Sequence, residues 1–327
     1  MKACIYGAGA IGGWLGMALA NAGCTVQMVA RGSTLTALRQ DGLRLTRPDG
    51  TVAHAAVQAS DAPAALGAQD LVVLAVKAPA LPDVAERIAP LIGPQTVVLT
   101  AMNGVPWWFL QGCEGPAHGQ RLRSVDPDGR IGAAIPGAQV VGGVVHASCS
   151  LLAPGHVRQH FGNRLLIGEP GGGASDRTTA LAEVLRRGGI DVEVSPRIQQ
   201  DIWFKLWGNL TMNPISALTG ATTDRILDDA LVRGFISAVM LEAKAIGERL
   251  GLPIHQQPED RHAVTRKLGA FKTSMLQDVE AGKPLEIDAL VAAVHELGTL
   301  TGTATPQTDA LLGLVRLMAQ QRGLYPV

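Results

Sequence analysis

Short apolar runs alternate with longer stretches of helical spacing over the first 195 residues. The runs are rich in β-branched residues, and the clearest of them are Ala3–Tyr6, Thr25–Val29, Leu71–Val76, Thr96–Thr100 and Val140–His146. Between these runs, Gly12–Ala22 and Leu81–Leu91 have the apolar spacing and the length of helices. This alternation predicts βαβ units that build a doubly wound parallel sheet.

The pattern changes at about residue 196, where strand-like runs disappear. Long helical periodicities follow, as in Leu231–Leu250 and Ala289–Gly298. A chain of 327 residues also exceeds what one core usually organises. We therefore predict an α/β domain over 1–196 and a mainly α-helical domain over 197–327, with loops at Gln111–Gln139 and Gly168–Ala174.

Composition and charge narrow the class of protein. Apolar residues make up 47% of the chain and charged residues 17%, which is typical of a folded globular protein. Lys plus Arg and Asp plus Glu both number 28, so no net field favours nucleic acid or an anionic membrane, and we expect neither as a partner. The four cysteines form no CxxC pair and the histidines no cluster of ligand spacing, which predicts no metal site.

The apolar runs also bear on location. They are far shorter than the roughly 20 residues that cross a bilayer, so we expect no membrane span. The first predicted strand begins at the third residue, which leaves no room for a signal peptide. We expect a soluble, cytoplasmic protein.

A glycine-rich sequence follows the first predicted strand and precedes the first predicted helix. Its residues are Gly7, Ala8, Gly9, Ala10, Ile11 and Gly12. The three glycines of such a GxGxxG sequence allow a tight turn, close approach of a pyrophosphate and close packing of helix on strand. The phosphates then meet the helix N-terminus. Placed between a strand and a helix, the sequence predicts the dinucleotide site of a Rossmann domain; the alternative is a glycine turn without a ligand.

The end of the second predicted strand bears on the choice of cofactor. An NAD site usually has an Asp or Glu there, but the first acidic residue of this chain is Asp41. Arg31 stands at that position instead, and its guanidinium suits a 2′-phosphate. We therefore predict NADPH as the cofactor, with a solvated surface arginine as the alternative. Lys77 and Asn103 each follow a predicted strand and are further candidates at the binding edge.

The segment Asp201–Asn213 is almost entirely apolar, so a helix here would be buried nearly all round. Lys205, Asn209 and Asn213 interrupt it at i, i+4 and i+8, on one stripe, before Pro214 breaks the pattern. Such a stripe needs polar partners, which a ligand, water or a structural carboxylate could supply. Reduction of a ketone needs an acid at its oxygen, and a lysine with a pKa lowered by burial can be that acid.

Towards the C-terminus, Ser274 and Glu286 flank the start of further predicted helices, and Asp288 follows closely. Carboxylates at a helix start commonly serve only the helix dipole. Spacing alone therefore leaves their role open.

Taken together, these segments make the chain resemble the ketopantoate reductase family, which reduces ketopantoate (2-dehydropantoate) with NADPH on the route to pantothenate. The resemblance covers almost the whole chain. The segments that carry it are GAGAIGG at Gly7–Gly13, Arg31, the strand ending in Lys77, Asn103-Gly104, FKLWGNLTMNP at Phe204–Pro214, SMLQD at Ser274–Asp278 and EIDAL at Glu286–Leu290.

The resemblance implies a role for each candidate. Lys205 is implied as the general acid, with Glu286 as its carboxylate partner near the nicotinamide ribose. Substrate contacts are implied for Asn209, Asn213 and Ser274, and Asn103 is implied beside both cofactor and substrate. Ser148, which follows the strand ending at His146, is implied as a cofactor contact.

Two departures from the family pattern concern the substrate. Thr223 stands where many members have a substrate-binding Asn, and a hydroxyl cannot reproduce the reach of an amide. The stretch Gln111–Gln139 is longer than in compact members, and Trp107-Trp108 before it either packs in a core or reshapes the pocket.

We predict an NADPH-dependent reductase of a small 2-keto acid, with ketopantoate as the favoured substrate. The alternatives are a related enzyme that reduces another 2-keto acid or oxidises a 3-hydroxy acid, and a non-catalytic NADPH sensor. The oligomeric state stays open, with a homodimer as one alternative.

Overall fold

The computed structural model describes residues 1–326, over which the chain divides into two units. The first comprises Met1–Met102 and Arg130–Ile198, and the second comprises Asn103–Gly129 and the chain from Gln199 onward. The sequence placed residues 103–129 in the first domain, but they group with the second unit. One reason is a backbone hydrogen bond in which Val105 donates to the carbonyl of Ala289, at 2.8 Å. The first domain is therefore discontinuous in sequence.

All strands formed by residues 1–326 belong to the first unit and make one sheet. They are β1 (Lys2–Tyr6), β2 (Thr25–Val29), β3 (Leu43–Thr46), β4 (Val52–Ala55), β5 (Gln58–Ser60), β6 (Leu71–Leu74), β7 (Val97–Thr100), β8 (Val140–Ala153), β9 (His156–Gly168) and β10 (Asp191–Val194). The helices of this unit are α1 (Ala10–Asn21), α2 (Gly32–Asp41), α3 (Leu81–Arg87), α4 (Arg130–Ala134) and α5 (Asp176–Arg187).

Six of the strands have the order β5-β2-β1-β6-β7-β8, and every neighbouring pair among them is parallel. The chain moves outwards from β1 in one direction to β2 and β5, and in the other direction from β6 to β7 and β8. This is the strand order of a Rossmann domain, so the predicted doubly wound sheet is confirmed. The order reverses between β1 and β6, where such sheets bind their ligands.

The rest of the sheet departs from the parallel arrangement that the sequence predicted. β8 turns back into β9 as a long antiparallel hairpin, and β3 joins β9 and pairs antiparallel with β4. β8 itself continues to Ala153, seven residues beyond the predicted end at His146. β9 was not predicted because its first nine residues, His156–Arg164, are mostly exposed and polar and have no continuous apolar run.

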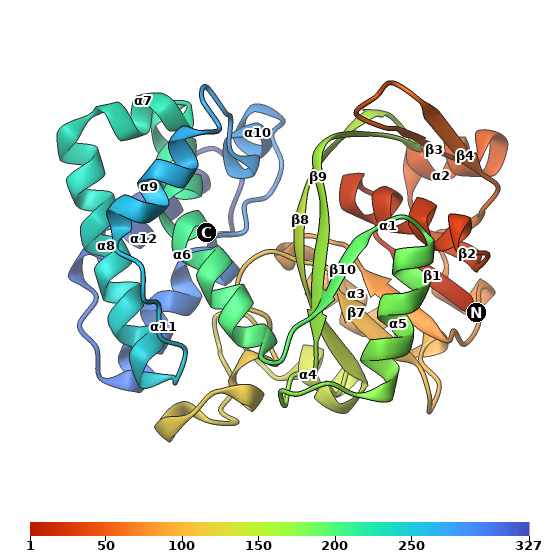
Figure 1. The fold of residues 1–327 in the computed structure, drawn as a ribbon, viewed down its shortest axis with the longest axis horizontal. Coiled ribbons are helices and arrows are strands. Elements are labelled where there is room, and N and C mark those ends of the chain that lie inside the picture. Colours follow the sequence, from red (N-terminus) through yellow and green to blue (C-terminus); the bar gives the residue numbers. More distant parts are fainter. Residues whose placement is uncertain (327) are drawn as a thin grey trace. The chain divides into compact units, whose positions relative to one another are not determined.

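Helices cover both faces of the parallel part of the sheet (Figure 1). Because crossovers between parallel strands are right-handed, α1 between β1 and β2 lies on the opposite face from α3 between β6 and β7. α1 is apolar almost all round, and it packs between the sheet and α5. A Cβ added to Gly188, after α5, would lie 2.1 Å from the carbonyl oxygen of Ala18 in α1. The helix that begins at the glycine-rich turn is thus fixed on both sides.

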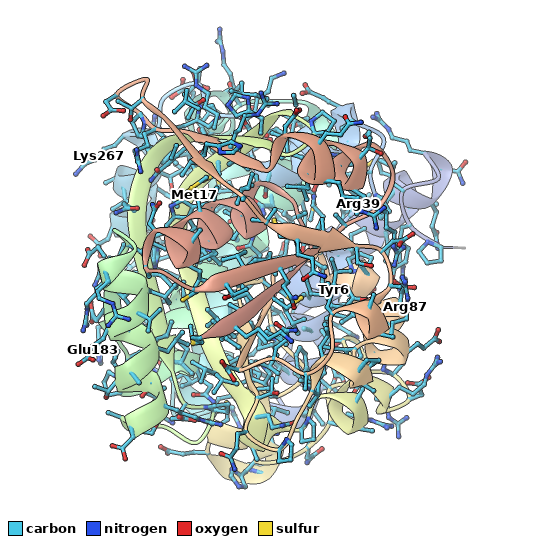
Figure 2. All side chains as sticks on the ribbon, turned by 90° about the vertical axis from the view of Figure 1, so that its right-hand side faces the viewer. Tyr6, Met17, Arg39, Arg87, Glu183 and Lys267 are labelled. Atoms are coloured by element: carbon cyan, nitrogen blue, oxygen red, sulfur yellow. The ribbon has the colours of Figure 1, made fainter. Side chains whose placement is uncertain are left out.

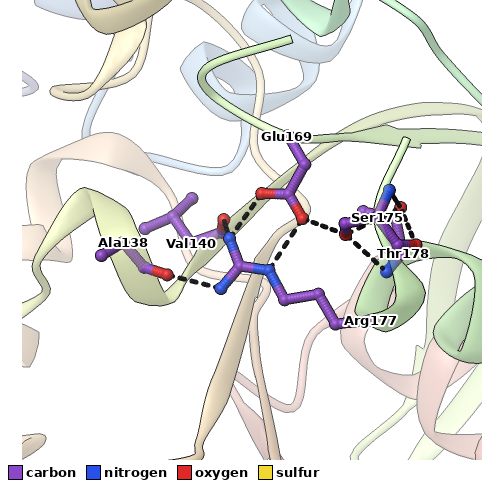
Figure 3. Close-up of polar contacts among 6 residues, drawn as sticks. All are labelled: Ala138, Val140, Glu169, Ser175, Arg177 and Thr178. Carbon is purple, nitrogen blue, oxygen red and sulfur yellow. Dashed lines mark hydrogen bonds and ion pairs between the residues drawn. The ribbon is translucent and has the colours of Figure 1, made fainter. Parts of the chain in front are cut away.

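A half-buried ion pair ties the end of the β8–β9 hairpin to α5 (Figure 3). Arg177 donates from Nε and Nη2 to the two carboxylate oxygens of Glu169, and its remaining hydrogen bonds go to the carbonyls of Ala138 and Val140. Although burial raises the pKa of Glu169, hydrogen bonds from Arg177 and from the hydroxyl of Ser175 hold it below its ordinary value. This carboxylate has its full set of partners and serves the fold.

The second unit is helical throughout its described residues, apart from loops and short turns. Its helices are α6 (Ile198–Thr219, in this unit from Gln199), α7 (Thr223–Asp228), α8 (Ala230–Arg249), α9 (Pro258–Arg266), α10 (Ser274–Glu280), the π-helix η7 (Asp288–Ala292), α11 (Ala293–Thr301) and α12 (Pro306–Gln321). Within residues 1–326, no helix has both the length and the apolar character that crossing a membrane requires.

Pro214 does not end α6, contrary to the sequence prediction; the helix runs on to Thr219. A proline inside a helix removes one backbone hydrogen bond and crowds the preceding turn. The residues around it, such as Leu210 and Ile215, are buried. We attribute the continuity of the helix to this packing, which offsets the cost of the proline.

Candidate active site

The turn between β1 and α1 depends on two glycines. Gly7 has φ +106°, and a Cβ there would lie 2.7 Å from the carbonyl oxygen of Ala75, just after β6. A Cβ at Gly12 would lie 2.0 Å from the carbonyl oxygen of Gly7. Both positions therefore need glycine for the fold of the turn itself. A Cβ at Gly9, in contrast, would meet no atom within 4 Å, so this position opens onto free space.

The N-terminus of α1 is suited to an anion. Gly9 is its N-cap and offers no side chain to the helix, and the first turn contains no acidic residue. The first N–H groups of a helix have no partner within it, so those of Ala10, Ile11 and Gly12 are left to a ligand. Together with Ala8, these residues form a turn whose open side and free donors fit the pyrophosphate of a dinucleotide.

Arg31 is a further cofactor candidate and lies two residues after β2, as the N-cap residue of α2. Its guanidinium forms an exposed ion pair with Asp83 of α3, a residue that the sequence analysis did not connect with this position. Arg87 lies 3.9 Å from the same carboxylate. Tyr6, at the end of β1, is near this group, and Figure 2 labels both Tyr6 and Arg87. The guanidinium groups of Arg31 and Arg87 thus share the carboxylate of Asp83, close to the end of β1, where the strand order reverses.

Lys77 and Ser148, two further cofactor candidates, differ in position from the sequence prediction. β6 ends at Leu74, so Lys77 lies in the segment after the strand and precedes a short turn of 3₁₀ helix. Ser148 does not follow a strand: it lies inside β8, at a bulge where the register with β9 shifts. The strand was predicted to end at His146 because the apolar run stops there. In the structure β8 continues beyond His146, through the bulge.

Lys205 is the centre of the polar group in the second unit. It lies on α6, and its Nζ donates a hydrogen bond to Oδ1 of Asn103, at 2.8 Å. Asn103 comes from the start of the segment 103–129 and is therefore more than a hundred positions away in sequence. The structure brings these two candidates into direct contact.

Burial of its ammonium group lowers the pKa of Lys205 from 10.5 to about 8. Glu286 opposes this shift because its negative charge favours the protonated lysine, and Arg261 adds to it. A lysine of this kind is protonated at neutral pH and can still release its proton. The electrostatic interaction also brings Glu286, which is buried, into the same group as Lys205 and Asn103.

A π-helical turn begins two residues after Glu286. The start of the segment 103–129 packs against this turn, η7. Val105 donates a backbone hydrogen bond to the carbonyl of Ala289, and a Cβ on Gly104 would lie 2.6 Å from the same oxygen. π-helical turns are frequent at functional sites. Asp288 accepts a hydrogen bond from the hydroxyl of Tyr325, at 2.6 Å, so its carboxylate is bound within the fold.

The remaining candidates have different surroundings. Asn209 is half-buried and Asn213 is buried, and both continue the stripe of Lys205 along α6. Ser274 is exposed at the first position of α10. The hydroxyl of Thr223 donates to the carbonyl of Gly269, at 2.8 Å, and the residue is 2% exposed. Thr223 therefore serves the local backbone.

Arg261 is a residue that sequence reasoning missed. It comes from α9, and its guanidinium lies over the ring of Phe204 with 5.5 Å between Cζ and the ring centroid. No motif points to this arginine, because only the packing of α9 on α6 brings it near Lys205. The unusual pair Trp107-Trp108, in contrast, is buried, which favours its interpretation as packing.

Among the described residues, no group of three or more His, Cys, Asp or Glu side chains is placed to hold a metal ion. The polar groups of the two sites are therefore lysine, arginine, amide and carboxylate side chains together with backbone N–H groups.

Comparison with known proteins connects both units to one family. Residues 3–172 match the family described as "Ketopantoate reductase PanE/ApbA", and residues 197–319 match "Ketopantoate reductase PanE/ApbA C terminal". A 2-dehydropantoate 2-reductase of Mesorhizobium japonicum is 48% identical over 99% of this chain and 100% of its own. A 2-dehydropantoate 2-reductase of Halobacterium salinarum is 26% identical over 99% of this chain and 100% of its own.

Solved structures agree with the sequence comparisons. A structure from Ralstonia solanacearum MolK2, described as a candidate ketopantoate reductase, has a TM-score of 0.95 and 60% identity, and 99% of each chain is covered. The 2-dehydropantoate 2-reductase of Methylococcus capsulatus has a TM-score of 0.83 and 26% identity, with 98% of each chain covered.

Proposed function

Because the chain belongs to the ketopantoate reductase family of oxidoreductases, we propose that it reduces ketopantoate to pantoate with NADPH. Among the structural observations, the one that carries the proposal is the buried ammonium group of Lys205 beside Asn103 and Glu286.

Reduction of a ketone adds a hydride to carbon and a proton to oxygen. When bound, NADPH supplies the hydride. Lys205 is the proton donor: its pKa of about 8 keeps it protonated at neutral pH, yet the proton is held less firmly than in an exposed lysine. Proton transfer from Nζ to the substrate oxygen prevents a full negative charge from forming there.

The neighbours of Lys205 keep the proton available and in position. Oδ1 of Asn103 accepts one of the three N–H groups of the ammonium and so restricts the direction of the others. Glu286 raises the pKa of Lys205 and keeps it protonated despite burial. Asn209, Asn213 and Ser274 bind the substrate in this proposal, the amides on the same stripe of α6 as the acid.

NADPH is proposed rather than NADH because of the charges after β2. Arg31 and Arg87 share the single carboxylate of Asp83, which leaves a net positive charge for a 2′-phosphate. Gly9 and the N-terminus of α1 would hold the pyrophosphate, and Lys77 and Ser148 are proposed as further cofactor contacts.

The proposal is tested by following oxidation of NADPH by the purified protein in the presence of ketopantoate, with NADH as the matched control cofactor. We expect turnover with NADPH and a kcat/KM at least tenfold lower with NADH. A panel of other 2-keto acids completes the measurement. Efficient turnover of another keto acid, with none of ketopantoate, would keep the chemistry and reject the substrate; tight NADPH binding without any turnover would reject the enzyme.

A further inference from the structure

The side chain of Arg261, on α9, contacts α6 and keeps its hydrogen-bond donors available. Its guanidinium lies over the ring of Phe204, with 5.5 Å between Cζ and the ring centroid, and approaches Gly208, one turn further along α6. A Cβ on Gly208 would lie 2.6 Å from Nε and 2.7 Å from Nη2, so only glycine allows this approach. An aromatic ring and a glycine accept none of its N–H groups in ordinary hydrogen bonds, so these contacts leave the donors of the guanidinium to other partners.

None of the described residues pairs with these N–H groups. Nε is buried without a hydrogen-bond partner, and no carboxylate forms an ion pair with the side chain. Burial lowers the pKa of Arg261, with no acidic neighbour to oppose it. On the same helix, the exposed Arg266 pairs with Asp228 at 2.8 Å. α9 thus has one arginine with a protein partner and one, beside the candidate acid, without.

The charges around Lys205 do not balance either. Lys205 and Arg261 are positive and close enough to influence each other, and Glu286 is the negative group that acts on Lys205. Together they sum to one excess positive charge in a partly buried site. Unpaired charge in such surroundings is costly unless a ligand supplies the opposite charge. A monoanionic ligand would complete the group.

We propose that Arg261 binds the carboxylate of the 2-keto acid substrate. This assignment rests on the proposed function and deepens it. In a 2-keto acid the carboxylate is attached to the ketone carbon, so a site needs one cation for the carboxylate and a separate acid for the ketone oxygen. Arg261 is the first and Lys205 the second. A guanidinium can bind both carboxylate oxygens at once, which fixes the direction of the ketone relative to the acid.

The assignment also bears on which substrates the enzyme accepts. The hydroxyl of Thr223 is engaged with the backbone at Gly269, so recognition of the substrate depends less on that position. An arginine that binds the carboxylate selects for 2-keto acids as a class. It places no demand on the side chain beyond the keto group.

The test compares a 2-keto acid with its uncharged methyl ester. In the NADPH-bound enzyme, Arg261→Gln should raise KM for ketopantoate by about 10- to 100-fold, the loss of a hydrogen-bonded charge pair, with kcat changed much less. Methyl ketopantoate should lose less than threefold in kcat/KM, because it has no carboxylate to bind. Equal losses for acid and ester would show that Arg261 only supports α6, and would overturn the proposal.

Two further variants separate binding from folding. Gly208→Ala keeps every charge but displaces the flexible end of Arg261, and alanine favours the helix. It should also raise KM for the acid and spare the ester. Arg266→Gln is the matched control from the same helix and should leave KM and kcat unchanged for both the acid and the ester. If Gly208→Ala leaves KM for the acid unchanged, the position of the guanidinium is irrelevant and the proposal fails.

Binding of pantoate to the NADP⁺-bound protein gives a measure that does not depend on turnover. Wild-type protein that binds pantoate without reducing ketopantoate would reject the proposed reaction, while a weaker binding of pantoate by Arg261→Gln would still support the role of Arg261. Equal binding by wild type and variant, or none by the wild type, would overturn it.

Discussion

The β1–α1 turn and the group around Lys205, the two proposed binding sites, are built in opposite ways. The turn uses backbone: six consecutive residues, 7–12, offer free N–H groups and an open position at Gly9, and no charged side chain takes part. The group around Lys205 uses side chains from four distant segments, with Asn103, Arg261 and Glu286 as the others. Each should therefore fail in its own way: the turn when a side chain is added, the group when one is removed.

The largest expected effect is at Lys205. Lys205→Ala removes the proton donor, and kcat should fall by about 100-fold or more, which is typical of a lost general acid. The dissociation constant for NADPH, measured by fluorescence titration, should stay within about twofold because the turn is untouched. A variant with near wild-type kcat would contradict the role of Lys205. It would also show that removing a side chain from this group does not impair it, contrary to the comparison above.

Paired substitutions in the turn should separate folding from binding. Gly9→Ala adds a Cβ in open space, so the thermal midpoint of the free protein should hold while NADPH affinity falls by about 5- to 100-fold, the equivalent of 1–3 kcal/mol. Gly12→Ala instead adds a Cβ against the carbonyl of Gly7 and should lower the thermal midpoint itself. Equal thermal midpoints for the two variants would show that the turn has more room than the structure allows.

The pH dependence tests the electrostatics of the other region. The protonated lysine is the acid, so kcat/KM should be highest below the pKa of Lys205, about 8, and fall about tenfold between pH 7 and 9. Glu286→Gln should move the midpoint of this fall to lower pH, because the carboxylate raises that pKa. A profile that is flat to pH 9, or a midpoint that moves upwards, would exclude the proposed pairing of Lys205 with Glu286.

The smallest effect is expected at Asp83, where a side chain does act on the cofactor region. Asp83→Asn releases Arg31 and Arg87 from an exposed carboxylate. Exposed ion pairs are worth about 0.2–1 kcal/mol, so NADPH should bind up to about fivefold tighter. NADH has no 2′-phosphate and serves as the control, with unchanged affinity. Equal tightening for both cofactors would place the phosphate elsewhere.

The same contrast explains what the sequence could predict. The glycine turn is local, and each of its residues is specified by its neighbours along the chain, so the turn and the doubly wound sheet were both predictable. The stripe Lys205, Asn209, Asn213 was visible because all three lie on one helix.

Other features depend on contacts between distant segments. Asp83 meets Arg31 across 52 positions, and Arg261 reaches Lys205 only because α9 packs on α6. The long hairpin of β8 and β9 was missed because its exposed half lacks an apolar run. Neither the spacing of residues along the chain nor its composition predicts these contacts.

The segment 103–129 has a consequence for how the protein is made. It leaves the ribosome before any residue from 199 onward, although its hydrogen-bond partners Ala289 and Leu250 belong to that later part. Asn103 is synthesised 102 positions before its hydrogen-bond partner Lys205, so at roughly 5–20 residues per second it lacks that partner for several seconds or more. During that interval the segment lacks the hydrogen-bond partners that later residues provide, so the second unit can be completed only after Ala289 has been synthesised.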